Sequence, residues 1–457
     1  MANHPKSIAV LGAGITGLAT AYRLTTLGHR VRLFERSPRI GGAIRTECSE
    51  GWLVEAGPNS FQESSPEVTA LLTELGLDAE RVESNPATKK RYLVRGGRLR
   101  AAPLSPPAFL ASSLFSPATK LRVLREFFSP PRVRTADLSI AELVRAHFGQ
   151  EVIDYGLQPF VSGIYAGDPE KLSARHAFPK LWELERTHGS FLKGQKALAK
   201  SRKERGEPAG PRIISFQRGL QTLPNALAAR LGPDALVRNA RIQALIPGAT
   251  WQVIWQDETN ASHTEAFDRV IATVPANALS QLSFGALGER PLAVLESVPH
   301  PPVASLFLGF HRSQVDHPLD GFGALVPAVE KRSVLGLIFS SSLFPQRAPE
   351  GHVALTVMAG GTLQPELGRL SADALWSRVR DDLRDLLGVT GAPLFMRHNA
   401  WPRAIPQYVL GYEHFLEAIT ACERAYPGFF VAGNVRDGIA LPSCLCAGLK
   451  IAGRAAA

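Results

Sequence analysis

Three glycines near the amino terminus have the spacing of a nucleotide-binding turn. Gly12, Gly14 and Gly17 form the pattern G-x-G-x-x-G directly after the apolar run from Ile8 to Leu11. In such a turn the first glycine permits a tight bend, the second lets the backbone approach a pyrophosphate, and the third lets a helix pack closely on a strand. The free N–H groups at the start of that helix attract phosphates. The pattern therefore predicts a dinucleotide site.

A carboxylate follows these glycines at the separation that ribose binding requires. Helical periodicity continues from Leu18 to Leu27, and Gly28 suits the residue after a helix. Arg30 to Phe34 then alternate as a second strand, and Glu35 stands at its end. An acid at this position accepts hydrogen bonds from the adenosine ribose and repels a 2′-phosphate, so NADP is disfavoured. An ordinary glycine turn would not need strand, helix and acid in this order, which favours the dinucleotide interpretation.

Two further glycine-containing segments favour FAD over a nicotinamide cofactor. The first contains Gly41, Gly42 and Arg45, and the second contains Gly57. A nicotinamide enzyme has no obvious need for them. FAD does, because its ribityl chain and isoalloxazine ring extend past the pyrophosphate and require more close approaches of the backbone, which glycine permits.

This succession of motifs resembles the flavin-dependent amine oxidase superfamily, whose early part carries G-x-G-x-x-G, an acid, R-x-G-G and a G-P turn. The resemblance implies that Arg45 lies near the flavin or the pyrophosphate, and a plain surface arginine is the alternative. The cofactor contacts that it implies in this part of the chain are Gly12, Gly14, Ile15, Thr16, Gly17, Glu35, Arg36, Gly42, Ala43, Arg45, Gly57, Pro58, Asn59 and Ser60.

The FAD-binding part is expected to be discontinuous in sequence. Val237 to Leu245, Gln252 to Gln256 and Val270 to Val274 have the composition of strands. The last of them resembles the strand that returns superfamily members to the FAD domain, and the chain from Gly428 onward resembles their closing strand, turn and helix. The further contacts that this resemblance implies are Ile242 with the adenine, and Gly433, Asn434, Ile439, Ala440 and Leu441 with the flavin ring or the pyrophosphate.

The segment from Asp154 to Leu184 discriminates within the superfamily. It contains Pro159-Phe160-Val161-Ser162-Gly163, then Gly167-Asp168-Pro169, then Phe178-Pro179. Taken alone, these residues predict only a helix, a turn and another helix. As one long ungapped stretch, the segment closely resembles the oxygen-dependent protoporphyrinogen oxidases, the flavoenzymes of haem synthesis. The resemblance covers nearly the whole chain, from Ile8 to Ile451.

This resemblance implies a site for a porphyrinogen. Leu325, Ile338 and Met358 lie in strand-like segments where the family packs apolar side chains against the tetrapyrrole, and simple core residues are the alternative. Gly163, with Val161 beside it, is implied to place backbone groups at the pyrrole nitrogens, and a helix-ending glycine is the alternative.

The carboxylates of such a substrate require a cation. Arg91 lies in a hairpin predicted from Thr88 to Arg100, and the resemblance implies that its guanidinium pairs with a propionate. Lys89 and Lys90 are nearby alternatives, and any of the three could be a solvated surface charge.

No residue is assigned a catalytic role. The sequence has no conspicuous Ser/His/Asp set, zinc spacing or pair of carboxylates in a shared motif. Hydride transfer to flavin N5 needs a positioned substrate in a dry pocket more than a strong base. The resemblance implies oxidation of protoporphyrinogen IX to protoporphyrin IX, with O₂ as acceptor and H₂O₂ as product. The alternatives are oxidation of coproporphyrinogen III, another flavin amine oxidase or desaturase, and an inactive FAD-binding scaffold.

The amino-acid composition limits which partners and which cellular location are expected. The chain has 457 residues, of which 45% are hydrophobic and 20% charged, as in a soluble globular protein of two or three units. A net charge of +10 suggests an acidic partner. Because no basic tail or aromatic-laced basic motif is present, lipid or a polycarboxylate substrate is favoured over nucleic acid. We expect a cytoplasmic protein, with peripheral attachment to the inner face of the cytoplasmic membrane and a homodimer left open.

The four cysteines have neither a redox nor a metal spacing. Cys48, Cys422, Cys444 and Cys446 are expected to be reduced thiols, and no metal site is predicted. The sequence around Cys444 and Cys446 does not look like that of amine oxidases that bind flavin covalently, so FAD is expected to be non-covalent.

One segment is both basic and amphipathic. Pro107 to Arg132 is rich in proline, arginine and apolar residues, with Leu121, Leu124, Phe127 and Phe128 on one helical side. Such a segment suits a membrane surface, and it equally suits a helix that covers its own core.

The predicted fold class is mixed α/β (α+β), with a Rossmann-type FAD-binding domain, a mixed-sheet substrate domain and a helical, membrane-facing domain. Lys193 to Arg212 is predicted to be a basic solvated loop. The predicted boundaries are 1–86, 205–284 and 426–457 for FAD binding, 87–102 and 285–425 for substrate binding, and 103–204 for the helical domain.

Overall fold

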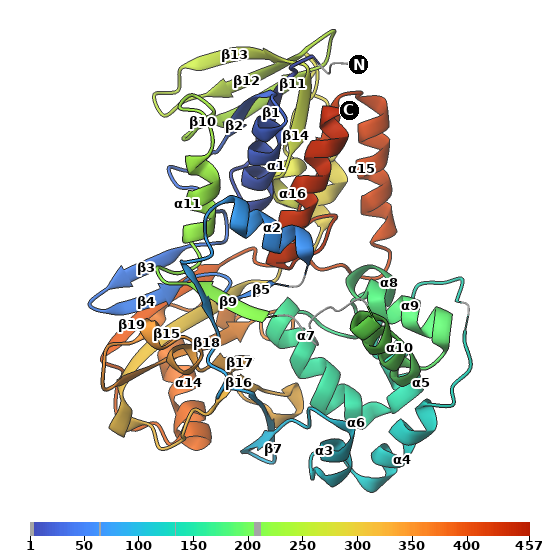
Figure 1. Cartoon of the computed structure of the whole chain (residues 1–457), viewed down its shortest axis with the longest axis vertical. Helices are drawn as coiled ribbons and strands as arrows, with labels where there is room; N and C mark the ends of the chain where they lie inside the picture. Colours follow the sequence, from blue (N-terminus) through green and yellow to red (C-terminus); the bar gives the residue numbers. More distant parts are fainter. Residues whose placement is uncertain (1–3, 64, 133, 205–211) are drawn as a thin grey trace.

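The computed structural model describes residues 4–63, 65–132, 134–204 and 212–457. It combines helices with several sheets, which confirms the predicted mixed α/β class. Figure 1 shows a parallel sheet flanked by helices at one end of the molecule, with both termini beside it. At the other end, a large mixed sheet lies on one side and a group of helices on the other.

The parallel sheet is assembled from three distant parts of the chain. Its order is β10-β2-β1-β14-β20, and every neighbouring pair is parallel. The central strand is apolar and almost fully buried, as expected for a strand covered on both faces. The strands are β1 (Ser7–Leu11), β2 (Arg30–Phe34), β10 (Leu236–Val237), β14 (Arg269–Ala272) and β20 (Phe429–Val431).

Two helices cover this sheet side by side. Helix α1 (Ile15–Thr26) connects β1 to β2, and α16 (Leu441–Ala456) closes the chain. They approach closely because small residues meet between them. A Cβ on Gly448 would lie 2.4 Å from the Thr16 carbonyl oxygen. A larger residue there would force the helices apart.

Smaller elements surround this unit. One correction concerns Val237 to Leu245, which were predicted as a single strand but are divided between β10 and β11. The chain bends between them at Asn239, whose φ is +54°. The elements are β3 (Thr46–Ser49), β4 (Trp52–Glu55), β5 (Phe61–Glu63), α2 (Pro66–Glu74), β6 (Arg81–Glu83), β9 (Arg212–Phe216), α11 (Thr222–Ala229), β11 (Arg241–Ile246), β12 (Trp251–Gln256), β13 (Ser262–Phe267), α12 (Ala276–Leu279) and α15 (Glu413–Ala425).

The mixed sheet has seven strands in the order β19-β15-β18-β17-β16-β7-β8. The predicted hairpin is confirmed, with its turn at Gly96 and Gly97, both at positive φ. One face of the sheet packs Leu306, Leu355 and Val357 against α14 (Ala372–Leu387). The strands are β7 (Lys90–Arg95), β8 (Arg98–Ala101), β15 (Val303–His311), β16 (Gly321–Leu325), β17 (Gly336–Ile338), β18 (His352–Gly360) and β19 (Phe395–Trp401), with α13 (Ser340–Leu343) between β17 and β18.

The remaining helices form the third region. The helix, turn and helix predicted between Asp154 and Leu184 are confirmed as α7, the Gly167-Asp168-Pro169 turn, and α8 with α9. The helices are α3 (Pro106–Ala111), α4 (Pro117–Glu126), α5 (Ile140–Phe148), α6 (Gln150–Val152), a π-helical turn (Ile153–Leu157), α7 (Gln158–Tyr165), α8 (Ala174–Ala177), α9 (Pro179–His188) and α10 (Phe191–Glu204).

The prediction of a basic loop from Lys193 to Arg212 is wrong for its first part. Residues up to Glu204 belong to α10, and 205–211 lie outside the described residues. The helix forms because its start is held from a distance: Glu126 accepts hydrogen bonds from the Phe191 N–H and from the Ser190 hydroxyl. Its basic side chains remain at the surface, so composition alone suggested a loop.

Helix α4 is anchored at its first turn by Glu151. Its carboxylate accepts hydrogen bonds from the backbone N–H and hydroxyl of Ser116 and pairs with Arg95 at 2.7 Å. Burial alone would raise the pKa of Glu151, but hydrogen bonds from Thr119, Ser116 and Arg95 lower it to about 2. Because the folded pKa is depressed, this contribution to stability is present above the unfolded pKa and is lost as the pH falls toward the folded one.

We therefore expect Glu151→Gln to lower the free energy of unfolding by about 1–3 kcal/mol at neutral pH. The difference from the wild type should shrink as the pH falls from about 5 toward 3, which denaturant titrations at several pH values would measure. A difference that stays constant over this range would show that the carboxylate charge is not what anchors α4.

Candidate flavin and substrate site

The glycines predicted for cofactor binding form one cradle at the end of β1. The Gly41 N–H donates to the Ala13 carbonyl at 2.8 Å, and a Cβ on Gly42 would lie 3.1 Å from the Gly14 Cα. A Cβ on Gly14 itself would meet nothing within 4 Å. The space in front of Gly14 is therefore open, as the approach of a pyrophosphate requires.

The other two glycines of the motif have packing roles. A Cβ on Gly17 would lie 1.9 Å from the Gly12 carbonyl oxygen and 2.6 Å from the Thr273 hydroxyl. Gly12 has φ of +97°, which other residues rarely adopt. These two positions hold α1 against the ends of β1 and β14, whereas Gly14 alone faces open space.

Two helix starts face this part of the molecule without side-chain caps. Helix α1 follows Gly14, and α16 follows Ala440. Their first N–H groups have no acceptor within the helix and are free for an anion. Gly448 contacts the α1 turn from Thr16 to Thr20, and more residues of α16 than of α1 precede this contact. At a rise of 1.5 Å per residue, α16 therefore begins up to about 9 Å further along than α1. Figure 1 shows that this start lies on the side toward the mixed sheet.

The contacts predicted near the carboxyl terminus lie between the glycine cradle and the start of α16. A Cβ on Gly433 would be 3.7 Å from the Thr16 hydroxyl, so the turn of Gly433 and Asn434 borders the first turn of α1. Ile439 packs on the core just before α16, and Leu441 is its first residue. These residues connect the phosphate end of the cradle with the start of α16.

Glu35 is held at the cradle by the backbone. Its two carboxylate oxygens accept hydrogen bonds from the N–H groups of Ala13 at 2.8 Å and Ser37 at 2.9 Å. Each oxygen keeps a further lone pair for a ribose hydroxyl. The Ala240 N–H donates to the Glu35 carbonyl, which brings the start of β11, with Ile242, to this end of the site. Arg36 is exposed beside it.

The second and third glycine segments lie between the cradle and the mixed sheet. A Cβ on Gly57 would be 2.1 Å from the Ala43 carbonyl oxygen, so the two segments touch. Pro58, Asn59 and Ser60 follow and are partly exposed. The Asn59 side-chain oxygen accepts a hydrogen bond from Thr356 on β18.

Arg45 also reaches the mixed sheet. Its guanidinium donates to the side-chain oxygen of Asn399 on β19 at 2.5 Å. Asn399 is paired in register with Ser305, and Ser305 with Met358. The row of polar residues Asn399, Ser305 and Thr356 had no motif to reveal it in the sequence, because its members come from three separate strands.

The three predicted apolar contacts lie on one face of the mixed sheet. Met358 pairs with Gly336, Leu325 also pairs with Gly336, and Ile338 lies two residues further on β17. Directly opposed residues share a face. Leu325, Ile338 and Met358 are partly exposed, whereas the alternating neighbours Ala324, Leu337 and Val357 are at most 3% exposed against α14. The face that bears the three residues is therefore not the one that α14 covers. We call it the site face.

Helix α7 borders the site face through Gly163. A Cβ on Gly163 would lie 2.4 Å from a methyl group of Leu325. The side chain of Val161 does not lie on this face. It is fully buried in the core beneath α7, because residues two apart in a helix point about 200° from each other.

Arg91 also belongs to the site face. Leu93 pairs with Leu325, and Arg91 lies two residues earlier on β7. Its guanidinium lies over the ring of Phe322 at 4.4 Å and donates to the Thr88 carbonyl oxygen. Burial lowers the pKa of Arg91, and within the described part of the chain no carboxylate forms an ion pair with it.

The neighbouring cations Lys90 and Arg95 form ion pairs with carboxylates. Lys90 pairs with Asp320 at 2.5 Å, and Arg95 pairs with Glu151. Lys89 is exposed. Of the cations on β7, only Arg91 combines the site face with a guanidinium free of acidic partners among the described residues.

A buried polar cluster lies behind Asn59. Arg347 is 1% exposed, donates to the Asn59 carbonyl and lies 3.9 Å from Glu55. Burial raises the pKa of Glu55 to about 7, although Arg347 opposes this, and lowers the pKa of Arg347 to about 10. Nε and Nη1 of Arg347 and the Ser305 hydroxyl are buried without a hydrogen-bond partner in the described residues. No signal in the sequence indicates this pair, because its members lie almost 300 positions apart.

These features fit FAD. The open space at Gly14, the carboxylate of Glu35 and two uncapped helix starts match the phosphates, the ribose and the flavin end of an extended dinucleotide. Cys444 lies in the first turn of α16, but it is buried, and burial raises the pKa of its thiol to about 11. A thiol of this kind is a poor nucleophile for a bond to flavin.

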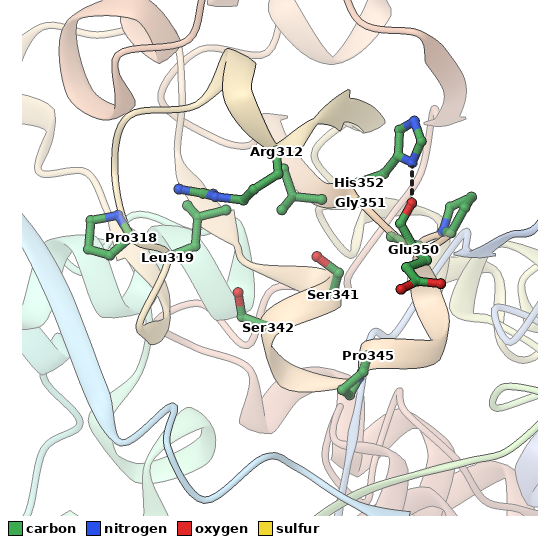
Figure 2. A pocket seen from close by; sticks show the side chains of 12 residues that line it. Arg312, Pro318, Leu319, Ser341, Ser342, Pro345, Glu350, Gly351 and His352 are labelled. Atoms are coloured by element: carbon green, nitrogen blue, oxygen red, sulfur yellow. Dashed lines mark hydrogen bonds between the residues drawn. The ribbon is translucent and has the colours of Figure 1, made fainter.

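A separate surface hollow lies elsewhere on the mixed-sheet region. Figure 2 shows that it is lined by Arg312, Ser341, Ser342, Glu350 and His352, among others, and its volume is about 370 Å³. Arg312 is already bound to the carbonyls of Val315 and His317. None of the lining residues belongs to the predicted site, and these contacts hold the surrounding turns together.

A Rossmann-type sheet with an open glycine cradle, joined to a mixed sheet with a partly exposed apolar site face, is the architecture of a FAD-dependent oxidoreductase. The chain belongs to the family described as flavin containing amine oxidoreductase, which matches residues 15–456.

The chain is similar to two curated proteins and to one solved structure. It is 35% identical to protoporphyrinogen oxidase 2, chloroplastic/mitochondrial, of Arabidopsis thaliana, over 98% of this chain and 93% of that protein. It is 28% identical to coproporphyrinogen III oxidase of Bacillus subtilis (strain 168), over 97% of both. The crystal structure of a candidate protoporphyrinogen oxidase from Exiguobacterium sp. 255-15 aligns with a TM-score of 0.83 and 23% identity, covering 99% of this chain and 98% of that one.

Proposed function

We propose that this enzyme oxidises protoporphyrinogen IX to protoporphyrin IX, with molecular oxygen as the electron acceptor. The observation that carries the proposal is the composition of the site face. Leu325, Ile338 and Met358 offer a partly exposed apolar surface, and the guanidinium of Arg91, which forms no ion pair with a described carboxylate, lies on the same face. Such a surface suits a large apolar macrocycle that bears carboxylates. The 35% identity to the Arabidopsis enzyme supports the assignment.

The chain's contribution to this reaction is positioning. When bound, FAD supplies the two-electron chemistry, and three turnovers with three O₂ account for the six electrons and for three H₂O₂. The apolar site face orients the macrocycle and keeps water from it, while Arg91 holds one edge. No side chain of the described site face is needed as a strong base.

Coproporphyrinogen III is the second candidate, because a relative with that name covers nearly the whole chain. That substrate carries four propionates and favours a more basic cavity. On β7, Lys90 and Arg95 are neutralised by Asp320 and Glu151, which leaves Arg91 as the cation without an acid. This arrangement favours the substrate with fewer carboxylates.

Aerobic turnover of the FAD-loaded protein on both porphyrinogens, side by side, tests the proposal. We expect kcat/KM for protoporphyrinogen IX to exceed that for coproporphyrinogen III by about tenfold or more, followed by porphyrin fluorescence and peroxide. Burying an additional propionate without a cationic partner costs enough free energy to produce a ratio of this size. The reverse preference would assign the second candidate. If neither porphyrinogen reduces the bound FAD under anaerobic conditions, the protein is an inactive scaffold.

We also propose that the helical region binds a membrane surface peripherally. Leu110, Leu121, Leu124 and Phe128, on and just beyond α3 and α4, are 47%, 49%, 51% and 78% exposed, with basic residues among them. Leu121 and Leu124 of α4 are therefore not buried in the core of the protein. No helix in the described ranges is long and apolar enough to cross a membrane. Apolar side chains with basic neighbours suit an anionic lipid surface.

Cosedimentation with vesicles of phosphatidylcholine and phosphatidylglycerol tests this proposal. We expect Leu124→Asp combined with Phe128→Asp to weaken binding about tenfold or more, since two apolar insertions are lost. Leu287→Asp is the matched control, because Leu287 is 92% exposed but lies outside α3 and α4. Equal binding of the double variant and the wild type would refute the proposal. Light scattering on the purified protein without vesicles would test whether it forms the homodimer that the sequence leaves open.

A further inference from the structure

A bulge in β16 turns Phe322 toward the site face. Gly321 pairs with Lys90 and Ala324 with Tyr92, so β16 has one residue more than β7 between these pairs. A Cβ on Gly321 would lie 2.8 Å from the Tyr92 ring, which is on the side of the sheet packed against α14. Ala324 is buried on that same side. Phe322 follows Gly321 and points the opposite way, onto the side of Arg91.

Gly323 is the extra residue that makes this possible. A Cβ there would lie 2.0 Å from the Leu337 carbonyl oxygen, so only glycine fits. Without the extra residue, strict alternation from Leu325 would put Phe322 on the α14 side of the sheet. Bulges of this kind redirect a side chain beside a functional site.

The redirected ring supports the guanidinium of Arg91. The centroid of Phe322 lies 4.4 Å from the guanidinium carbon, and the backbone of Phe322 is fixed by a hydrogen bond from Phe339. Stacking uses the face of the guanidinium and leaves its in-plane N–H groups for hydrogen bonds. Nη1 donates to the backbone carbonyls of Thr88, Lys89 and Lys90, and Nε and Nη2 have no hydrogen-bond partner among the described residues. Arg95 is stacked in the same way on Tyr155, but its N–H groups donate to the Glu151 carboxylate and to the Leu114 carbonyl. Arg91 is thus positioned without being neutralised.

We propose that Phe322 is a positioning residue that orients Arg91 toward a carboxylate of the substrate and so contributes to carboxylate selectivity. The inference rests on the proposed porphyrinogen substrate. An arginine held in one orientation loses less side-chain entropy when it binds, so the effect appears in affinity and not in the redox step.

The test compares Phe322→Leu with Phe322→Tyr, which keeps the ring. We expect Phe322→Leu to raise KM for protoporphyrinogen IX about three- to tenfold, with kcat, FAD content and melting temperature unchanged. Phe322→Tyr should stay near the wild type. In an Arg91→Ala background, Phe322→Leu should change KM less than about twofold. An equal effect in both backgrounds, or a fall in kcat, would overturn the inference.

Measurements of product binding test the role of Phe322 independently of the proposed reaction. Quenching of porphyrin fluorescence would give Kd for protoporphyrin IX and for its dimethyl ester, which lacks the carboxylate charges. Phe322→Leu should weaken binding of the free acid by the same factor as KM and leave the ester unchanged. If the wild type binds the acid without oxidising the porphyrinogen, the proposed reaction fails while this measurement still decides the role of Phe322. Equal loss for acid and ester would refute it.

Discussion

Gly14→Val is expected to give a folded protein that retains no FAD. The wild-type residue has φ of −69° and ψ of 176°, which valine also adopts, and a Cβ there meets no protein atom within 4 Å. The valine methyl groups would instead occupy the space that the pyrophosphate needs. We expect less than about a tenth of the wild-type flavin in the purified protein, measured as the ratio of flavin to protein absorbance.

Variants of two other glycines serve as controls for Gly14→Val. Gly232→Val puts the same side chain into open surface space outside the predicted cofactor contacts, and should keep full FAD. Gly17→Ala should instead damage the fold, because its Cβ would lie 1.9 Å from the Gly12 carbonyl oxygen. Circular dichroism and melting temperature separate the two kinds of loss. Full flavin occupancy in Gly14→Val would refute the assignment of the cradle.

The cradle could be predicted because its parts are local. Gly12, Gly14, Gly17 and Glu35 lie within one strand, helix and strand, and the hydrogen bonds that hold Glu35 come from Ala13 and Ser37, its near neighbours in the fold. A motif of this kind needs no knowledge of how distant strands pair.

The polar edge of the site could not be predicted in the same way. Arg45 meets Asn399 across more than 350 positions of sequence, and Asn399 faces the site only because of its register with Ser305. A shift of one residue would turn Asn399 to the other face of the sheet. The sequence contains the residues but not the register.

The sequence does not reveal an element whose structure depends on a backbone irregularity or on a distant partner. The bulge at Gly323 reverses the direction of Phe322, and nothing in a regular alternation indicates it. In the same way, the start of α10 depends on Glu126, 65 positions before Phe191, so its basic composition suggested a loop.

Arg91→Ala is expected to raise KM for protoporphyrinogen IX about ten- to a hundredfold, with kcat and FAD content unchanged. Loss of a charge-assisted contact to a carboxylate has this magnitude. The effect falls on KM because the carboxylate pairs equally well before and during the redox step. Steady-state kinetics with flavin absorbance as a loading check would measure it.

Two further variants, Arg91→Lys and Lys90→Ala, show what the guanidinium of Arg91 contributes. Arg91→Lys should recover only part of the affinity, because an ammonium supplies charge without the planar fork and stacks less well on Phe322. Lys90→Ala should change KM little, because Lys90 is already paired with Asp320. If Arg91→Ala left KM unchanged while Lys90→Ala raised it, the carboxylate would bind at the edge of β7 and not on the site face. The apolar surface of Leu325, Ile338 and Met358 would then have to orient the macrocycle without a cation on its own face.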